Sequence, residues 1–583
     1  MKASAASLYE FGDFRVDATK RRLLRLDDAP VPLTPKVFDT LLYLVEHHGV
    51  VLDKDRLMEA VWPDAIVEEN NLSQNISTLR RVFGESRGSH RYIVTVPGRG
   101  YRFVADVKTS PALANSPSNA PIKSIAVLPF KPLLIENRDS SLEMGMADTL
   151  IARLSSIRDI VVRPLGAVRK YIDLHQEPLL AGRELGVESV LDGSIQKCGG
   201  DIRMNVRLMN VANGASLWTG IFDEKFTDIF TVQDAISERV VAALSLQLSK
   251  EEKQQLTKRH TENTEAYQLY LKGRYYWWKT TPEEFRKSRD YFQRAVDADP
   301  SYALGYCGLN SYYGFGAAWG MLPPNEGWPR AEKAVGKALE LDDTLAEVHN
   351  DLGALKLVYR RDWAGAEREI QRAIALNPAF EEVHYLYSFF LVAMGRFDEA
   401  IAEATRALEL DPLSVRITQH LGNSFYYARR YDEAIAQYEQ ALELDPNNAS
   451  VHESLGDALE QKELPGKAVA EWQKGMTLAG DNELAALLGS TYGKGGFARG
   501  VSAVAKKKLE RLNERTKKGC YVPAIEHARA YVRIGDKEKA FQRLEKAADE
   551  RNVFALLINS DPFYDSLRED PRFVALLKRI GLQ

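Results

Sequence analysis

The amino-acid sequence predicts a multidomain chain: an α+β unit at the N-terminus, a small α/β domain in the middle and an all-α array of helix pairs toward the C-terminus. Three observations lead to this prediction. The length of 583 residues is several times that of a typical single domain. A Ser/Pro/Ala/Asn-rich segment, TSPALANSPSNAP, interrupts the chain at residues 109–121. Helix-ending prolines then recur 34 residues apart, at Pro378, Pro412 and Pro446.

The composition, with 45% hydrophobic and 27% charged residues, excludes a mostly disordered or fibrous chain. The 77 basic and 81 acidic side chains leave a net charge of −4, which at face value argues against a nucleic-acid partner. The three cysteines, Cys198, Cys307 and Cys520, are too far apart to suggest a disulfide framework or a zinc site. The sequence has no apolar run long enough for a transmembrane helix, and its start is unlike a signal peptide. We therefore expect a cytoplasmic protein.

Short alternating strands are expected over residues 8–30, and three helices follow. Thr34 and Pro35 mark a helix start, since proline is favoured at the first helical position. This helix is expected to end at Gly49 and to bury Phe38, Leu41, Leu42 and Val45. Asp53 is expected to cap a second short helix.

The third helix, expected from Asn70 to Phe83, has two chemically different faces. The apolar positions predict a buried stripe of Leu72, Ile76, Leu79 and Phe83. The opposite face carries short hydrogen-bonding groups and arginines: Asn70, Ser73, Gln74, Ser77, Thr78 and Arg81, with Arg80 beside them. An ordinary solvated face favours Lys and Glu, whereas these groups can read base edges and phosphates in a major groove. Taken alone, the pattern fits a merely polar face equally well.

Two alternating strands, residues 92–96 and 101–104, flank a turn and predict a β-hairpin with Arg99 at its tip. Residues 71–104 contain six arginines and one acidic residue, Glu85, which is a local net charge of +5. The remainder of the chain then carries −9, so the acidic total does not argue against DNA. A hairpin that brings Arg99 to a minor groove would complete a DNA reader made of a helix and a wing.

The motifs LTPKVFDTLLYLVEHHGVVLDKDRLMEAVWPD, NNLSQNISTLRRVFG and RYIVTVPGRGYRFV, in this order, resemble the OmpR/PhoB-type winged-helix DNA-binding domain over residues 8–106. In that family the third helix enters the major groove of double-stranded DNA and the last hairpin contacts the minor groove. The loop before the third helix, here from Trp62 to Glu69, meets RNA polymerase. The resemblance implies that the DNA-facing residues are Asn70, Asn71, Ser73, Gln74, Ser77, Thr78, Arg80, Arg81, Thr95, Arg99 and Arg102.

The sequence departs from that family at three positions. Several members carry arginine where this chain has Ser77 and Thr78, so its base preference should differ. Position 97 is proline, so any minor-groove contact should shift to Arg99. No receiver domain precedes the unit, and residues 107–121 are predicted to be a flexible linker where CadC-like proteins have a transmembrane helix. The chain therefore resembles a one-component, HilA-like regulator, with two copies on tandem half-sites as the family expectation.

Residues 122–255 alternate between strand and helix patterns and predict a small α/β domain. The strand patterns lie at 124–130, 160–162, 189–195, 202–209 and 217–222. A helix is expected from Phe230 to Leu248. The region resembles, more loosely, the TolB N-terminal and FlgO-like domains of bacterial regulators. Its role stays open between ligand sensing, dimerisation and spacing.

A period of 34 residues organises the chain from residue 263 to 555. Ala400 and Ala434 recur at this interval, as do Gly422 and Gly456, and small residues at fixed positions allow two helices to pack closely. The period resembles that of tetratricopeptide repeats. We expect about eight repeats stacked into a superhelix, followed by a cap at residues 556–583.

The tetratricopeptide resemblance implies a concave groove that binds a protein or peptide. By repeat register its residues are Asn350, Glu382, Tyr385, Phe389, Arg416, Gln419, Asn423, Tyr426, Glu453, Asp457 and Glu460. An ordinary solvated inner face is the alternative interpretation. His349, His384 and His452 share one position of successive first helices, where we expect them to pack between helices and not to bind metal.

No motif predicts an enzyme. Residues 489–494 approximate a phosphate-binding loop, but the spacing is one residue short and Gly495 stands where Ser or Thr would bind Mg²⁺. The sequence has no HExxH and no GxSxG motif. We therefore expect no catalytic residues, no cofactor and no metal site.

These features predict a cytoplasmic, sequence-specific transcriptional regulator of the bacterial type. Residues 8–106 would bind promoter DNA, and the repeats would bind a protein, a peptide or another effector that gates activity. One alternative is a tetratricopeptide scaffold whose winged helix contacts only protein. A weaker alternative is an enzyme within the middle domain.

Overall fold

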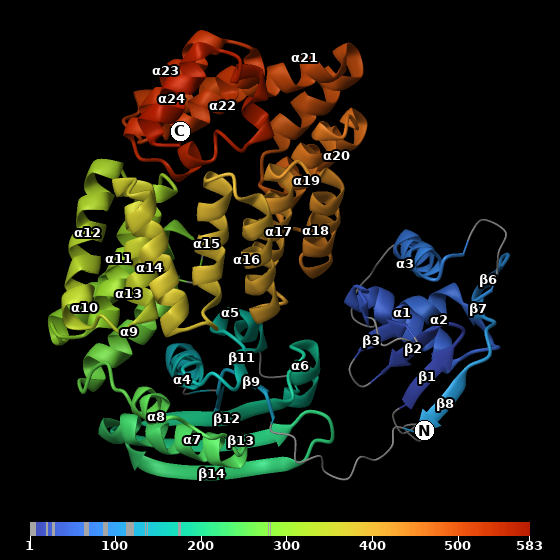
Figure 1. Cartoon of the computed structure of the whole chain (residues 1–583), viewed down its shortest axis with the longest axis vertical. Helices are drawn as coiled ribbons and strands as arrows, with labels where there is room; N and C mark the ends of the chain where they lie inside the picture. The colour runs from blue at the N-terminus through green and yellow to red at the C-terminus, as the bar shows by residue number, and fades with distance from the viewer. Residues whose placement is uncertain are drawn as a thin grey trace. The chain divides into compact units, whose positions relative to one another are not determined.

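The structure, a computed structural model, describes residues 7–18, 21–25, 30–62, 69–85, 91–111, 122–134, 136, 138–172, 177–277, 279 and 281–582. The chain divides into two compact units, Met1–Ala120 and Pro121–Gln583 (Figure 1). The predicted fold class is confirmed, because a strand-rich first region, an α/β region and a long helical array follow one another. None of the helices within the described residues is long and apolar enough to cross a membrane.

Two sheets and three helices are found in the described part of the first unit. The larger sheet has the order β4-β3-β2-β1-β8 and the smaller has the order β5-β7-β6. The elements are β1 Ser7–Phe11, β2 Phe14–Asp17, β3 Arg22–Arg25, β4 Pro30–Val31, α1 Pro35–Glu46, β5 Val51–Asp53, α2 Lys54–Val61, α3 Glu69–Val82, β6 Ile93–Val96, β7 Gly100–Phe103 and β8 Lys108–Pro111.

The core of the first unit follows the predicted helix faces with one exception. Phe38, Leu41 and Val45 of α1 are buried as expected. Leu42 is only half-buried, and Leu44 is fully buried instead. One step along a helix turns the side chain by about 100°, so Leu42 falls at the edge of the apolar face.

The predicted linker is partly a strand. Residues 108–111 form β8, which pairs antiparallel with β1 from Glu10 to Ser7. The first residues of the linker predicted over 107–121 thus pair with β1 as an edge strand of the larger sheet, a partner that composition alone does not reveal. Residues 112–121 lie outside the described residues.

The second unit begins with a mixed sheet of order β11-β9-β12-β13-β14, and β10 also pairs with β12. Its elements are β9 Ser124–Val127, β10 Lys131–Pro132, α4 Ser140–Leu154, β11 Val161–Val162, α5 Leu165–Val168, α6 Pro178–Glu184, β12 Ser189–Cys198, β13 Asp201–Asn210, β14 Ser216–Lys225, α7 Ile229–Ala243 and α8 Lys250–Leu256. The helix expected to reach Leu248 thus ends earlier, and Ser245 takes a left-handed φ of 55° before α8 begins.

Paired helices then stand side by side, with the sheet of the second unit at one end of the array and α22–α24 at the other (Figure 1). Within the described residues they form eight pairs and a final helix. The helices are α9 Thr264–Trp277, α10 Pro282–Ala298, α11 Ala303–Ala318, α12 Pro324–Leu341, α13 Ala346–Leu355, α14 Trp363–Leu376, α15 Glu381–Ala393, α16 Phe397–Leu410, α17 Val415–Tyr427, α18 Tyr431–Leu444, α19 Ala449–Gln461, α20 Pro465–Leu478, α21 Asn482–Lys517, α22 Ala524–Ile534, α23 Lys537–Asp549 and α24 Pro571–Ile580.

The long α21 is itself a helix pair. Gly496 adopts φ 78° and ψ −176°, a backbone region that favours glycine, and breaks the helix there. Arg511 on the second half reaches back to Asp481 and Glu483 at the start of the first half. The residues that approximate a phosphate-binding loop, 489–494, are helical and lie in the first half.

Candidate functional site

The third helix of the first unit presents one polar face and buries the other. Leu72, Ile76 and Leu79 are at most 2% exposed. The side chains that are exposed are Asn70, Asn71, Gln74, Ser77 and Arg81, and those that are half-buried are Ser73, Thr78 and Arg80. The structure thus places the predicted α3 residues on one side of the helix, apart from the core.

A buried amide that the sequence reasoning missed fixes how α3 is oriented. Asn75 is 8% exposed and donates from Nδ2 to Thr40 Oγ1 at 3.0 Å and to the Lys36 carbonyl at 3.2 Å. Buried polar groups require such partners, so Asn75 and Thr40 lock the rotation of α3 against α1. The signal in the sequence that could have revealed this role of Asn75 was a polar residue within an apolar helix stripe.

Arg80 joins the end of α3 to the hairpin formed by β6 and β7. Its Nη2 donates to Thr95 Oγ1 at 2.8 Å and to the Ile93 carbonyl at 3.1 Å. Glu85, which follows α3, accepts from the Tyr92 backbone N–H at 2.5 Å and lies 3.8 Å from Arg80. The guanidinium group of Arg80 therefore positions the hairpin as well as adding charge to this face.

The hairpin carries the other predicted residues. Arg99 and Thr95 are exposed, whereas Arg102 is half-buried on β7. Gly98 adopts φ 72° in the turn, and a Cβ at Gly100 would collide with the Leu52 carbonyl of the neighbouring strand. The two glycines therefore permit a tight tip with Arg99 between them. Of the loop expected to meet RNA polymerase, residues 63–68 lie outside the described residues.

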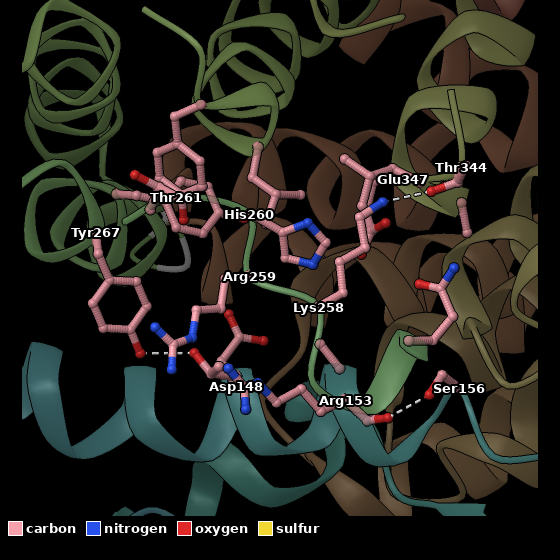
Figure 2. Close-up of a pocket in the computed structure, with 18 of the residues that line it drawn as sticks. Asp148, Arg153, Ser156, Lys258, Arg259, His260, Thr261, Tyr267, Thr344 and Glu347 are labelled. Carbon is pink, nitrogen blue, oxygen red and sulfur yellow. Dashed lines mark hydrogen bonds between the residues drawn. The ribbon is translucent and has the colours of Figure 1, made fainter. Parts of the chain in front are cut away.

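A polar cavity of 140 Å³ marks the junction between the α/β region and the first repeats in the second unit. Figure 2 shows Asp148 and Arg153 on α4, and Ser156 just after it, facing the segment that carries Lys258, Arg259 and His260. The charges are matched within the chain: Arg274 lies 3.2 Å from Asp148, Arg259 lies 2.6 Å from Asp234, and Lys258 lies 2.6 Å from Asp342.

Hydrogen bonds and one apolar cluster join the α/β region to the first repeats at this junction. The Tyr267 hydroxyl on α9 lies 2.8 Å from Thr149 Oγ1 on α4 and accepts from Gln233 Nε2 at 2.7 Å. Burial raises the pKa of Tyr267 to about 12, so its hydroxyl keeps its proton. One apolar cluster runs without interruption from Ile125 in β9 to Ala334 in α12. The α/β region therefore shares one hydrophobic core with the first repeats.

Some residues of the predicted groove line a cavity, and others make contacts with side chains of the same chain. Tyr385, Phe389 and Asn423 line a cavity. Arg416 donates to Glu382 and its guanidinium group lies over the Tyr385 ring, and Gln419 donates to Ser450 and Ser454. Tyr426 is buried, Asn350 is half-buried and Glu453 is exposed.

The far end of the predicted groove faces the chain's own C-terminal region. Arg533 on α22 donates to Glu460 at 2.7 Å and lies 3.8 Å from Asp457, and Arg529 lies 3.9 Å from Asp457. Burial raises the pKa of Asp457 to about 7, against the opposing effect of these two guanidinium groups. These carboxylates are thus matched within the chain, which the repeat register could not reveal.

The recurring histidines bridge helices, as expected. His384 lies 2.6 Å from Glu403 through Nδ1 and 3.0 Å from the Pro378 carbonyl through Nε2. His452 and His349 repeat this arrangement with Glu471 and Glu369. Among the described residues, no group of three His, Cys, Asp or Glu side chains could hold a metal ion.

Family models match all three regions of the chain. A model described as "Transcriptional regulatory protein, C terminal" matches residues 28–103. A model described as "HilA/YgeH-like transcriptional regulator, second domain" matches residues 121–239. Two tetratricopeptide-repeat models match residues 357–418 and 422–462.

Three relatives bear on function. Transcriptional regulator HilA of Salmonella typhimurium is 25% identical over 395 residues, which is 67% of this chain and 68% of that protein. Transcriptional activator CadC of Escherichia coli is 38% identical over 76 residues, 13% of this chain and 15% of that protein. A Rhizobium meliloti protein whose name refers to adenylate cyclase is 28% identical over 234 residues, 40% of this chain and 39% of that protein.

The region that matches the regulatory C-terminal model contains α3 and the β6–β7 hairpin, and the region that matches the second-domain model contains the mixed sheet. The chain is homologous to HilA over 395 residues. Its three regions thus match an OmpR/PhoB-type regulatory domain, a HilA/YgeH-like second domain and tetratricopeptide repeats.

Proposed function

We propose that the first unit binds promoter DNA in a sequence-specific manner, with α3 in the major groove and Arg99 of the hairpin at the minor groove. One observation carries this proposal: the exposed face of α3 holds amide, hydroxyl and guanidinium groups on a helix that is locked by Asn75. Amides and guanidinium groups make bidentate contacts with base edges, and a fixed helix keeps those contacts in register.

The side chains divide into two roles by chemistry and exposure. Asn70, Asn71, Gln74 and Ser77 are short and exposed, and they would read bases. Arg81 and Arg99 would contact phosphates, and Arg80 and Thr95 would hold the wing against the helix. The loop from Trp62 to Glu69 would contact RNA polymerase, with two copies of the chain on tandem half-sites.

The second unit would sense an effector and gate the activity of the first. Its α/β region shares one core with the first repeats, so an event in those repeats can alter the α/β region. A scaffold whose first unit contacts only protein is the alternative, and it predicts no affinity for duplex DNA.

The test is selection of bound duplexes from a random pool with the full chain. We expect a defined preferred sequence for the wild type and a changed sequence for Gln74→Ala. Gln293→Ala, an exposed glutamine on α10 of the other unit, is the matched control and should select the wild-type sequence. No salt-sensitive duplex binding by the wild type would overturn the proposal and favour the scaffold.

A further inference from the structure

An apolar cavity, open to solvent on one side, lies among the helices of the repeats. Its volume is 280 Å³, and its walls come from α9, α11, α12, α13, α15 and α17, with the segment Val553–Leu556 and Leu557 closing one side. The walls are largely apolar, and the aromatic side chains among them include Trp277, Phe315, Trp319, Trp328, Tyr385 and Phe554. Ligand pockets are typically lined in this way, by apolar side chains with a few polar groups.

The rim of the cavity exposes aromatic rings. Trp319 is 46% exposed, Phe315 is 40% exposed and Phe554 is 37% exposed. The ring centroids of Phe315 and Trp319 are 5.4 Å apart, and those of Trp319 and Phe554 are 5.2 Å apart. A contiguous exposed aromatic patch at the mouth of a cavity marks a surface that an apolar ligand would cover.

The C-terminal segment shapes this space into a pocket and not an open channel. Ser560 Oγ donates to the Val392 carbonyl of α15 at 2.7 Å, and Leu557 is 4% exposed. An extended peptide lying along the groove would have to displace these contacts and the ion pairs of Asp457 and Glu460. The cavity volume of 280 Å³ suits a small molecule better.

The charge of the lining limits the class of ligand. The described lining residues include no lysine or arginine, and Asp351 is the one carboxyl group among them. Burial raises the pKa of Asp351 to about 7, and burial together with Arg416 lowers the pKa of His420 to about 3, so the imidazole is neutral. The faces of aromatic rings are electronegative as well. An anion would therefore lose its hydration and meet no cation in return.

We propose that this cavity binds a small, ring-containing apolar molecule that carries no negative charge. A cavity of roughly 150 Å³ accommodates benzene, so the larger volume here suits about two fused rings. If the chain is the regulator proposed above, this molecule is its effector, and that last identification rests on the proposed function. The binding site itself does not depend on it.

The test is titration of the full chain with N-phenyl-1-naphthylamine, an uncharged probe that joins a phenyl ring to the two fused rings of naphthalene. We expect one saturable site, followed by probe fluorescence and by energy transfer from tryptophan, since Trp277, Trp319 and Trp328 line the cavity. The anionic probe 8-anilino-1-naphthalenesulfonate should not compete for this site. Binding of the two probes with equal affinity at one site would overturn the charge argument.

Two substitutions of alanine by phenylalanine test whether the probe binds in the cavity. Ala354 lines the cavity on α13, and Ala354→Phe fills it, so the affinity should fall at least about tenfold. Ala364 is exposed on α14 of the same repeat, and Ala364→Phe should bind as the wild type does. If Ala354→Phe misfolds by circular dichroism, Trp319→Ala at the exposed rim replaces it and should also weaken binding. Equal affinity in the wild type and in the folded cavity variant would overturn the site.

Duplex binding by the same variants separates the two proposals. All of them should retain duplex affinity without the probe, because the substitutions lie outside the first unit. Probe binding that is lost in the cavity variant and retained in Ala364→Phe supports the site whether or not duplex DNA is bound. Absence of duplex binding with intact probe binding overturns only the proposed function.

Discussion

The predicted DNA-facing arginines differ in what they contact. Arg80 is half-buried and donates to two groups of the hairpin, whereas Arg81 is exposed at the last turn of α3. A hydrogen bond from a charged donor contributes more than a neutral one, so Arg80 should matter for folding as well as for binding. Adjacent residues of one motif thus have separable roles.

Substituting each arginine by alanine should distinguish these roles. Arg81→Ala should leave the free energy of unfolding within about 0.5 kcal/mol and should reduce the slope of log K against log[salt] for duplex binding by about one. Arg80→Ala should lower the free energy of unfolding by about 2 kcal/mol. Urea denaturation and binding at a series of salt concentrations measure both effects. An unchanged slope for Arg81→Ala would exclude a phosphate contact.

His420 should make the second unit sensitive to acid. Its ring packs on Tyr385 with the centroids 4.0 Å apart, and burial and Arg416 lower its pKa from 6.5 to about 3. Because the folded-state pKa lies below the unfolded-state value, the stabilisation is present above pH 6.5 and is lost as the pH falls toward 3. Between pH 7.5 and pH 5 this amounts to about 2 kcal/mol.

The measurement is urea denaturation at the two pH values for the wild type and for His420→Leu. The variant should lose about 2 kcal/mol less on acidification, because leucine does not titrate. Tryptophan fluorescence follows mainly the second unit, since Trp62 alone of the eight tryptophans lies in the first. The same loss in both proteins would show that His420 titrates normally in the folded state.

At the scale of elements, α21 shows how one residue divides a long helix into a pair. Without the break at Gly496, residues 482–517 would form a single long helix. Its apolar side chains would then have no second half of the helix to pack against. The positive φ of Gly496 turns the chain back on itself, and Gly500 then approaches the backbone of Tyr492. Residues 482–517 are therefore a helix pair with a tight turn at Gly496.

Gly496→Ala and Gly493→Ala should have opposite effects. Alanine at 496 must adopt a backbone conformation that favours glycine and should cost about 1–3 kcal/mol. Alanine at 493, an exposed helical position with no neighbour within 4 Å of its Cβ, should stabilise by about 0.5–1 kcal/mol. Thermal or urea denaturation compares the two. Destabilisation of similar size in both would contradict a turn at Gly496.

At the scale of the second unit, the C-terminal residues contact a segment in the middle of the helix array. Arg361, at the end of the segment after α13, donates from Nη2 to the Ala548 carbonyl at 2.6 Å and from Nη1 to the Arg579 carbonyl at 3.4 Å. Trp319 and Ser560 make the contacts that complete the cavity. The C-terminal residues therefore cap the array and also shape the proposed binding pocket.

Arg361→Gln should loosen this closure. Loss of the charged donor should cost about 2 kcal/mol locally, which corresponds to hydrogen exchange about 30-fold faster in residues 549–582. The adjacent Arg360→Gln removes an exposed ion pair with Glu332 and should change exchange there less than about threefold. Mass spectrometry of exchanged peptides gives both values. Equal exchange in the two variants would show that Arg361 does not hold the C-terminal segment.

The sequence by itself determined the features that depend on local periodicity. The buried stripe of α3, the Arg99 hairpin tip and the 34-residue helix pairs follow from spacing and turn chemistry, because each is set by residues a few positions apart. The polar face of α3 could be predicted for the same reason. The continuous core of the α/β region and the repeats could not, since it joins helices with no shared motif.

The tertiary structure alone decided the contacts between distant residues. The partners of Arg80, the pairing of β8 with β1, and the closure that joins Arg361 to Ala548 link segments whose local patterns say nothing of one another. For the same reason, local patterns do not reveal that Tyr385 of the predicted groove lines a cavity. Nor do they reveal that Asp457 forms an ion pair within the chain. Helix periodicity fixes which face of a helix is buried, whereas packing of the whole chain selects what covers it.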